Sequence, residues 1–139
     1  MKKQVLAFVG VLSLFLAAGS AFAQSHEVRA NIPFDFVVSK TTLPAGTYSI
    51  TRAGITSDTL VVRCLNCKMA QLVGTMRRGS GKITDRSKLV FRRYGDRYFL
   101  SQIWVEGSDQ IRVLPKTALE SEVAMDLTPN DVVLYASAR

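Results

Sequence analysis

Histidine and cysteine, which supply many catalytic and metal-binding groups, are scarce in this sequence. The 139 residues include one histidine, His26, and two cysteines, Cys64 and Cys67. A structural zinc site takes four ligands, so these three side chains are too few, and we expect no metal. His26 lies near the start of the predicted mature chain, where a catalytic base would not be held in place. The sequence therefore disfavours histidine-dependent catalysis.

Glycine patterns that bind phosphate groups are also missing. The segment Arg77–Lys82 contains Gly79 and Gly81, but their spacing is not that of a P-loop, and no dinucleotide fingerprint occurs. We expect no cofactor.

Long apolar runs are limited to one, residues 5–18, which is 14 residues long. A membrane-spanning helix needs about 20 residues. The run follows Lys2 and Lys3 and precedes Ala21-Phe22-Ala23, an order typical of a secretory signal peptide. We therefore predict that residues 1–23 are removed after Ala23 and that no transmembrane segment remains. Residues 24–139 would form a single β-rich domain, secreted or periplasmic.

Helical patterns are rare in the mature chain, whereas short apolar runs bounded by turn residues are common. We predict strands near residues 28–32, 35–38, 47–52, 58–64, 67–75, 87–94, 97–105, 110–114 and 131–136. One capping box, Thr117 to Glu120, predicts a short helix that turns Leu119, Val123 and Met125 inward. The sequence thus predicts an all-β fold, an antiparallel β-sandwich or flattened barrel with one short helix in its C-terminal region.

The turn Tyr94-Gly95-Asp96-Arg97 predicts a two-residue hairpin with a type II′ turn. Uninterrupted pairing from this turn places Phe91 opposite Leu100, Leu89 opposite Gln102 and Ser87 opposite Trp104. Trp104 is then expected to be buried on the inward side of the hairpin.

Three motifs carry a resemblance to a known family: Ile32-Pro33-Phe34-Asp35-Phe36, then residues 43–48 (LPAGTY), then residues 93–100 (RYGDRYFL). With these motifs the chain resembles a group of small exported bacterial proteins that are frequent in acidobacteria. The resemblance implies a shared β fold and export. It implies no activity, ligand or catalytic residue, and the pair of cysteines departs from its pattern.

Cys64 and Cys67 are spaced as in thioredoxin-type redox motifs, but their flanks predict strands rather than the strand and helix that such motifs need. The interpretation we favour is structural, as a disulfide at a hairpin tip or as buried thiols. A redox or regulatory role and a metal site are the alternatives.

Basic residues outnumber acidic ones. Without Lys2 and Lys3 the chain has 16 basic and 11 acidic residues, a net charge of +5. In the predicted hairpin, cations share a face with aromatic rings, and more cations lie in the adjoining loop. This predicted anionic-ligand face comprises Lys88, Arg92, Arg97, Tyr94 and Phe99 with Arg77, Arg78 and Lys82. A solvated sheet face is the simpler alternative.

These features favour a non-enzymatic exported module that binds a partner or serves as a structural component of the envelope. An anionic glycan, a lipid head group or an envelope protein would suit the basic face, and export excludes intracellular nucleic acid. The alternative is a small secreted hydrolase that acts on a glycan with a pair of carboxylates. Two acids and aromatic rings in one pocket would favour that alternative.

Overall fold

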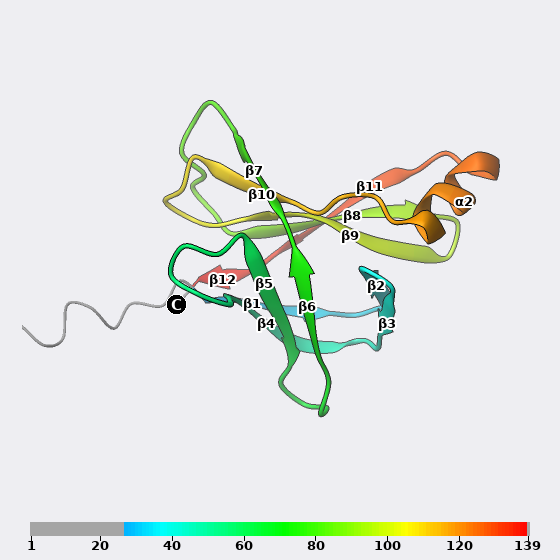
Figure 1. The fold of residues 1–139 in the computed structure, drawn as a ribbon, viewed down its shortest axis with the longest axis horizontal. Coiled ribbons are helices and arrows are strands. Elements are labelled where there is room, and N and C mark those ends of the chain that lie inside the picture. Colours follow the sequence, from blue (N-terminus) through cyan, green and yellow to red (C-terminus); the bar gives the residue numbers. More distant parts are fainter. Residues whose placement is uncertain (1–26, 139) are drawn as a thin grey trace, which may run out of the picture.

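The computed structural model describes residues 27–138. Strands account for 53% of the structure and helix for 8%, which confirms the predicted all-β class. Two sheets pack face to face, and one short helix lies at one end of the second sheet (Figure 1). The signal peptide predicted over residues 1–23 and His26 lie outside the described residues.

The first sheet has the strand order β12-β1-β4-β5-β6, with every pair antiparallel. Its strands are β1 (Val28–Ile32), β4 (Gly46–Arg52), β5 (Thr59–Cys64), β6 (Ala70–Gly74) and β12 (Ser137–Ala138).

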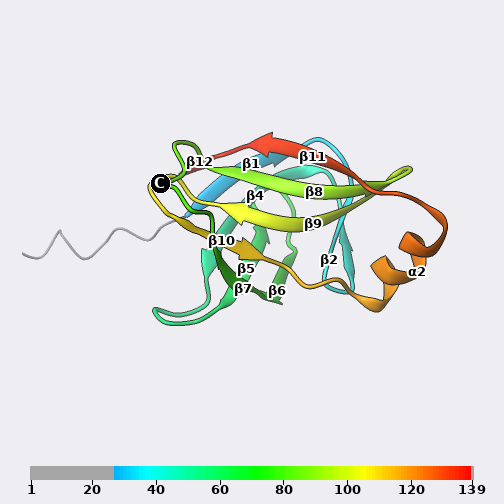
Figure 2. The same ribbon diagram turned by 90° about the horizontal axis from the view of Figure 1, so that it is seen from above.

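The second sheet has the order β11-β8-β9-β10-β7, again antiparallel (Figure 2). Its strands are β7 (Met76–Gly79), β8 (Lys88–Tyr94), β9 (Arg97–Trp104), β10 (Gln110–Val113) and β11 (Asn130–Tyr135). The hairpin of β2 (Phe36–Val38) and β3 (Thr41–Leu43) joins this sheet through one parallel pair, Val37 with Phe99. Strands β3, β7 and β12 were not expected, because they are short and β7 falls in the segment predicted to be a loop.

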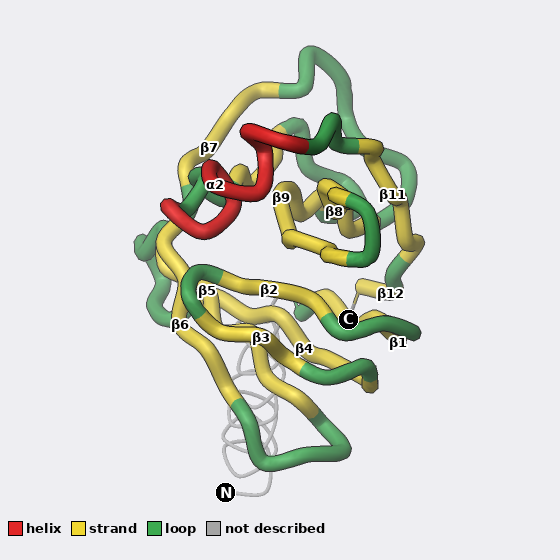
Figure 3. The backbone as a smooth tube through the Cα atoms, turned by 90° about the vertical axis from the view of Figure 1, so that its right-hand side faces the viewer, coloured by secondary structure: helices red, strands yellow, loops and turns green. Residues whose placement is uncertain are grey.

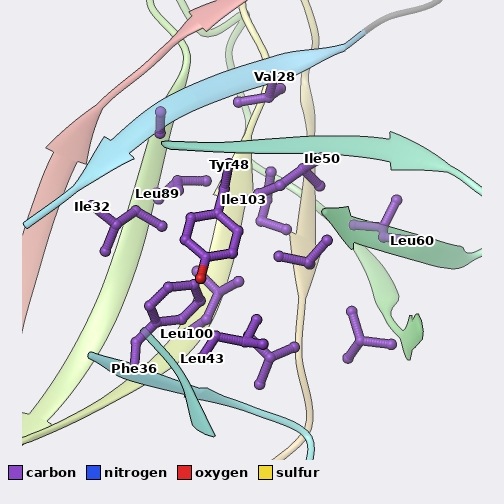
Figure 4. Close-up of a cluster of buried hydrophobic side chains, with 14 of the residues drawn as sticks. Val28, Ile32, Phe36, Leu43, Tyr48, Ile50, Leu60, Leu89, Leu100 and Ile103 are labelled. Atoms are coloured by element: carbon purple, nitrogen blue, oxygen red, sulfur yellow. The ribbon is translucent and has the colours of Figure 1, made fainter. Parts of the chain in front are cut away.

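The chain passes from the first sheet to the second between β6 and β7. Thr75 lies at this crossing, and both its amide and its hydroxyl donate to the carbonyl of Asp58, at 3.0 and 2.6 Å. The edge strand β6 of the first sheet is therefore followed directly along the chain by β7, the edge strand of the second sheet. The two sheets enclose one main core, part of which is shown in Figure 4.

The three sequence motifs, residues 32–36, 43–48 and 93–100, meet in this core. Phe34 stacks on Tyr98 with ring centroids 3.7 Å apart, and Phe36 packs edge-on against Tyr48 and Phe91. The Tyr48 hydroxyl donates to the carbonyl of Pro44 at 2.6 Å. Burial and, secondarily, the charge of Asp35 raise the pKa of Tyr48. The motif residues thus pack in the core and maintain the fold.

The register of the β8–β9 hairpin departs from the prediction beyond Phe91. Phe91 pairs with Leu100 as expected, but a β-bulge follows, and Leu89 pairs with Ile103 while Lys88 pairs with Trp104. Ser101 is the extra residue, and its hydroxyl donates to the carbonyl of Val90 at 3.0 Å. Because one residue of offset exchanges the faces of a strand, Ile103 is buried and Trp104 faces outward. The predicted burial of Trp104 on the inward side was wrong.

The predicted helix is α2 (Ala118–Asp126), capped by the hydroxyl of Thr117, which accepts from the Glu120 amide at 3.3 Å. Leu119 and Val123 pack inward as expected, whereas Met125 is 85% exposed and was wrongly assigned. Figure 3 shows α2 above β9, on the side away from the first sheet.

Candidate functional site

The two aromatic rings of the predicted anionic-ligand face are not on the surface. Tyr94 and Phe99 are 0% and 2% exposed, and their rings meet edge-on with centroids 5.6 Å apart. With Val37 they form a second core beneath Leu119 and Val123 of α2. Sequence periodicity gave the correct face of the hairpin for both rings, but the helix that covers them made this part of the prediction wrong.

Arg92 is also part of the structure rather than of a free basic surface. Its guanidinium forms a two-pronged ion pair with the carboxylate of Glu120, which is 2% exposed. The hydroxyl of Tyr94 donates to the same carboxylate at 3.1 Å. Burial, and then the hydrogen bond to Glu120, raise the pKa of Tyr94. This buried triad of Arg92, Tyr94 and Glu120 holds α2 against the sheet.

The structure separates the remaining predicted cations. Arg97 is exposed beside the hairpin turn, and Lys82 is exposed in the loop between β7 and β8. Arg77 and Arg78 are neighbours on β7 and point to opposite faces of the second sheet. Of the predicted cations, Lys88 and Arg78 share a surface with Trp104 and Tyr135.

That surface is the outer face of the second sheet, defined here by two rows of residues that pair directly across its strands. The first row runs through Tyr135, Lys88, Trp104, Ile111 and Arg78. The second row runs through Val133, Val90, Gln102, Val113 and Met76. Residues directly opposite in an antiparallel pair share a face, so all ten positions lie on one side.

Cations and rings alternate at one edge of this outer face. The Arg86 guanidinium lies 4.1 Å from the ring centroid of Tyr135, and the Lys88 ammonium lies 4.2 Å from that of Trp104. The Trp104 indole also donates to the Gln102 side chain at 2.9 Å, which fixes the ring. None of the ten positions is acidic. The outer face is thus basic and aromatic; it keeps Lys88 and Arg78 of the predicted face, with Trp104 and Tyr135 as its rings in place of Tyr94 and Phe99.

Apolar side chains are exposed on the same face. Tyr135 is 58% exposed, Met76 57% and Val133 44%. Such an uncovered apolar surface next to cations is typical of contact sites.

A cleft of about 410 Å³ opens between the two sheets, at the end remote from α2. Its floor is apolar and is formed by Val28, Ile50, Leu60 and Ile103, all labelled in Figure 4. Its wall carries three arginines, Arg52, Arg77 and Arg112, and two acids, Glu106 and Asp109. Nothing in the sequence predicted this cleft, because its residues come from six strands and the loop between β9 and β10.

The cleft contains two acids, as the hydrolase alternative would require, but no aromatic side chain among its lining residues. Glu106 and Asp109 are both exposed in the loop between β9 and β10. A glycosidase holds its two carboxylates in a shaped site across a sugar ring. The lining of the cleft therefore gives the hydrolase alternative little support.

Cys64 and Cys67 are joined by a disulfide at the tip of the β5–β6 hairpin. Asn66, between them, accepts a hydrogen bond from the Thr47 amide at 3.3 Å, and the Leu65 amide donates to the Thr47 carbonyl at 2.8 Å. A Cβ atom at Gly46 would lie 2.7 Å from the Asn66 side-chain oxygen, so a larger residue there would displace the Asn66 side chain. The disulfide belongs to a structural clip over the start of β4.

Within residues 27–138, no group of three or more histidine, cysteine, aspartate or glutamate side chains is arranged to hold a metal ion. Over the same range, no helix has both the length and the apolar character needed to cross a bilayer. Comparison with known proteins yields no similar family model, curated protein or solved structure.

Proposed function

We propose that this protein is a non-enzymatic binding module of the cell envelope that contacts an acidic glycan through the outer face of its second sheet. The proposal rests on the first row, in which Lys88 lies between Tyr135 and Trp104. The Arg86 guanidinium lies over the Tyr135 ring, and the Lys88 ammonium lies over the Trp104 ring.

The chemistry of the outer face suits a polymer that is both anionic and partly apolar. Lys88, Arg86 and Arg78 attract carboxylate or sulfate groups. The exposed ring of Tyr135 and the adjacent Val133 present apolar area for the C–H surfaces of sugar rings. Tyr135 and Trp104 stand two strands apart, about 9.6 Å at the usual strand spacing, so an extended chain can reach both.

Binding to polygalacturonate, with dextran as the neutral control, tests the proposal. We expect the protein to bind polygalacturonate, and binding to weaken as salt rises, since the Debye length falls from about 10 Å at 0.1 M to about 3 Å at 1 M. The double variant Arg86→Ala/Lys88→Ala should bind about tenfold more weakly, the equivalent of about 1.4 kcal/mol.

Arg97→Ala is the matched control, because it removes one exposed cation of the same hairpin that lies at the turn, outside the two rows that define the outer face. It should bind like the wild type at equal salt. Equal loss in Arg97→Ala and Lys88→Ala would mean that net charge alone attracts the polymer and would overturn the proposal. Binding to anionic lipid vesicles without binding to polygalacturonate would overturn it in favour of a lipid surface.

The same proposal places the protein outside the cytoplasm, on the basis of the signal-peptide pattern that ends at Ala23. Intact mass of the protein recovered from the envelope fraction should correspond to a chain that starts at Gln24. A cytosolic protein that retains residues 1–23 would contradict the proposed location.

A further inference from the structure

The cleft between the sheets lies on the opposite side of the second sheet from the outer face. Arg112 pairs with Ile103 and with Arg77 across neighbouring strands, so both arginines project from the core side of that sheet. Whatever occupies the cleft therefore contacts neither Trp104 nor Lys88. The cleft is therefore spatially separate from the outer face.

The cleft is apolar at depth and cationic at its mouth. Val28, Ile50, Leu60 and Ile103 form the floor and are each between 1% and 4% exposed. A volume of about 410 Å³ falls within the range of small-molecule sites, about 300–1,000 Å³. Among its lining side chains, three guanidinium groups outnumber the two carboxylates of Glu106 and Asp109.

Asp58 already shows how the arginines bind a carboxylate. One oxygen of this side chain lies 2.6 Å from Arg112 and 2.9 Å from Arg77. The Arg112 side chain is only 13% exposed, whereas that of Asp58 is 47% exposed. A guanidinium has five N–H donors, so the two arginines have further donors for a second anion. Asp58 comes from the loop before β5 and is not part of the cleft lining.

We propose that the cleft binds the carboxylate of a small amphiphilic acid, with its hydrocarbon chain on the apolar floor and its head group at Arg77 and Arg112. Asp58 competes with the ligand for the same two guanidinium groups. The site therefore has a built-in competitor whose removal strengthens binding of an acid and leaves binding of the corresponding alcohol unchanged.

Calorimetry and amide chemical shifts of the purified protein with decanoate, and with decanol as the uncharged comparison, test this site. Decanoate should bind and should shift the amides of Val28, Ile50 and Gln110, which line the cleft. Arg77→Gln should weaken decanoate about tenfold. Asp58→Asn should tighten it severalfold, with no effect of either change on decanol.

One further variant and the exposure of Arg77 make the outcome decisive. Arg86→Ala/Lys88→Ala should leave decanoate binding intact, so failure of the acidic-glycan proposal and failure of this one are separable. Arg77 is 54% exposed, so Arg77→Gln reports on the site even if Asp58→Asn does not fold. Absence of decanoate binding, equal binding of decanol, or unchanged or weaker binding in folded Asp58→Asn would each overturn the inference.

Discussion

At the scale of single residues, Ser101 decides which side chains the second sheet presents to solvent. Ser101 is 1% exposed, and its hydroxyl donates a hydrogen bond to the Val90 carbonyl on the neighbouring strand. The bulge shifts every later position of β9 to the other face. Ile103 therefore fills the core, and Trp104 joins Lys88 on the outer face.

This arrangement predicts losses of stability of different size for substitutions at two adjacent residues. Ile103→Ala should lower the free energy of unfolding by about 2–5 kcal/mol, the usual cost of emptying a core position. Trp104→Ala should cost less, since the indole is only partly buried and loses mainly a cation–π contact of about 0.5–1 kcal/mol. Urea unfolding of both variants provides the measurement.

Acrylamide quenching gives a second measurement, because Trp104 is the only tryptophan. We expect the native protein to be readily quenched. A quencher-protected Trp104, or a Trp104→Ala variant that is less stable than Ile103→Ala, would contradict the bulged register.

At the scale of elements, the start of α2 is encoded locally by its capping residue, whereas its attachment to the sheet depends on residues distant in the sequence. The Thr117 cap is visible in the sequence, as is the Glu120 of the capping box. In the structure the Glu120 side chain instead binds Arg92 and Tyr94, which lie 28 and 26 residues away. The element is predictable, but the role of its buried acid is not.

The buried triad predicts a large effect from a small change. Glu120→Gln should lower the free energy of unfolding by up to about 3 kcal/mol, because it leaves Arg92 without its anionic partner in a largely buried position. Glu122→Gln, on the exposed side of the same helix, is the matched control and should change stability by less than about 0.5 kcal/mol. Equal stability of the two variants in urea would exclude the triad as the anchor of α2.

The triad also makes stability depend on alkaline pH. The pKa of Tyr94 in the folded protein is raised above its ordinary value of 10.0, so the folded state holds this proton more tightly than the unfolded chain. The resulting stability is complete below pH 10.0 and is lost as the pH rises through the folded value. In Glu120→Gln, tyrosinate absorbance should show Tyr94 titrating at lower pH than in the wild type.

At the scale of the whole molecule, the crossing between β6 and β7 links the two sheets, and Asp58 reinforces it. Its carbonyl accepts two hydrogen bonds from Thr75, while its carboxylate binds Arg77 and Arg112 of the second sheet. The sheets are thus tied together beside the cleft and are closed at the other end by the β2–β3 hairpin. This asymmetry leaves one end open, and it is there that the cleft lies.

Much of the fold could be predicted without the structure. Each of the nine predicted strands overlaps an observed one, because Val, Ile and aromatic runs between turn residues are a local property of the chain. The turn at Gly95 was also predictable, and this residue has a φ of +59°, which glycine adopts without strain. Short strands such as β3 and β7 lack that local signal and exist only because a neighbouring strand pairs with them.

By itself, the sequence determined the β class, the position of most strands, the helix cap and the concentration of cations around the β8–β9 hairpin. Only the tertiary structure decided which of those cations are free: α2 covers Tyr94 and Phe99, Glu120 binds Arg92, and the bulge brings Trp104 to Lys88. The physical reason is that strand formation depends on neighbouring residues, whereas the exposure of a side chain depends on register and on elements that arrive from elsewhere in the chain.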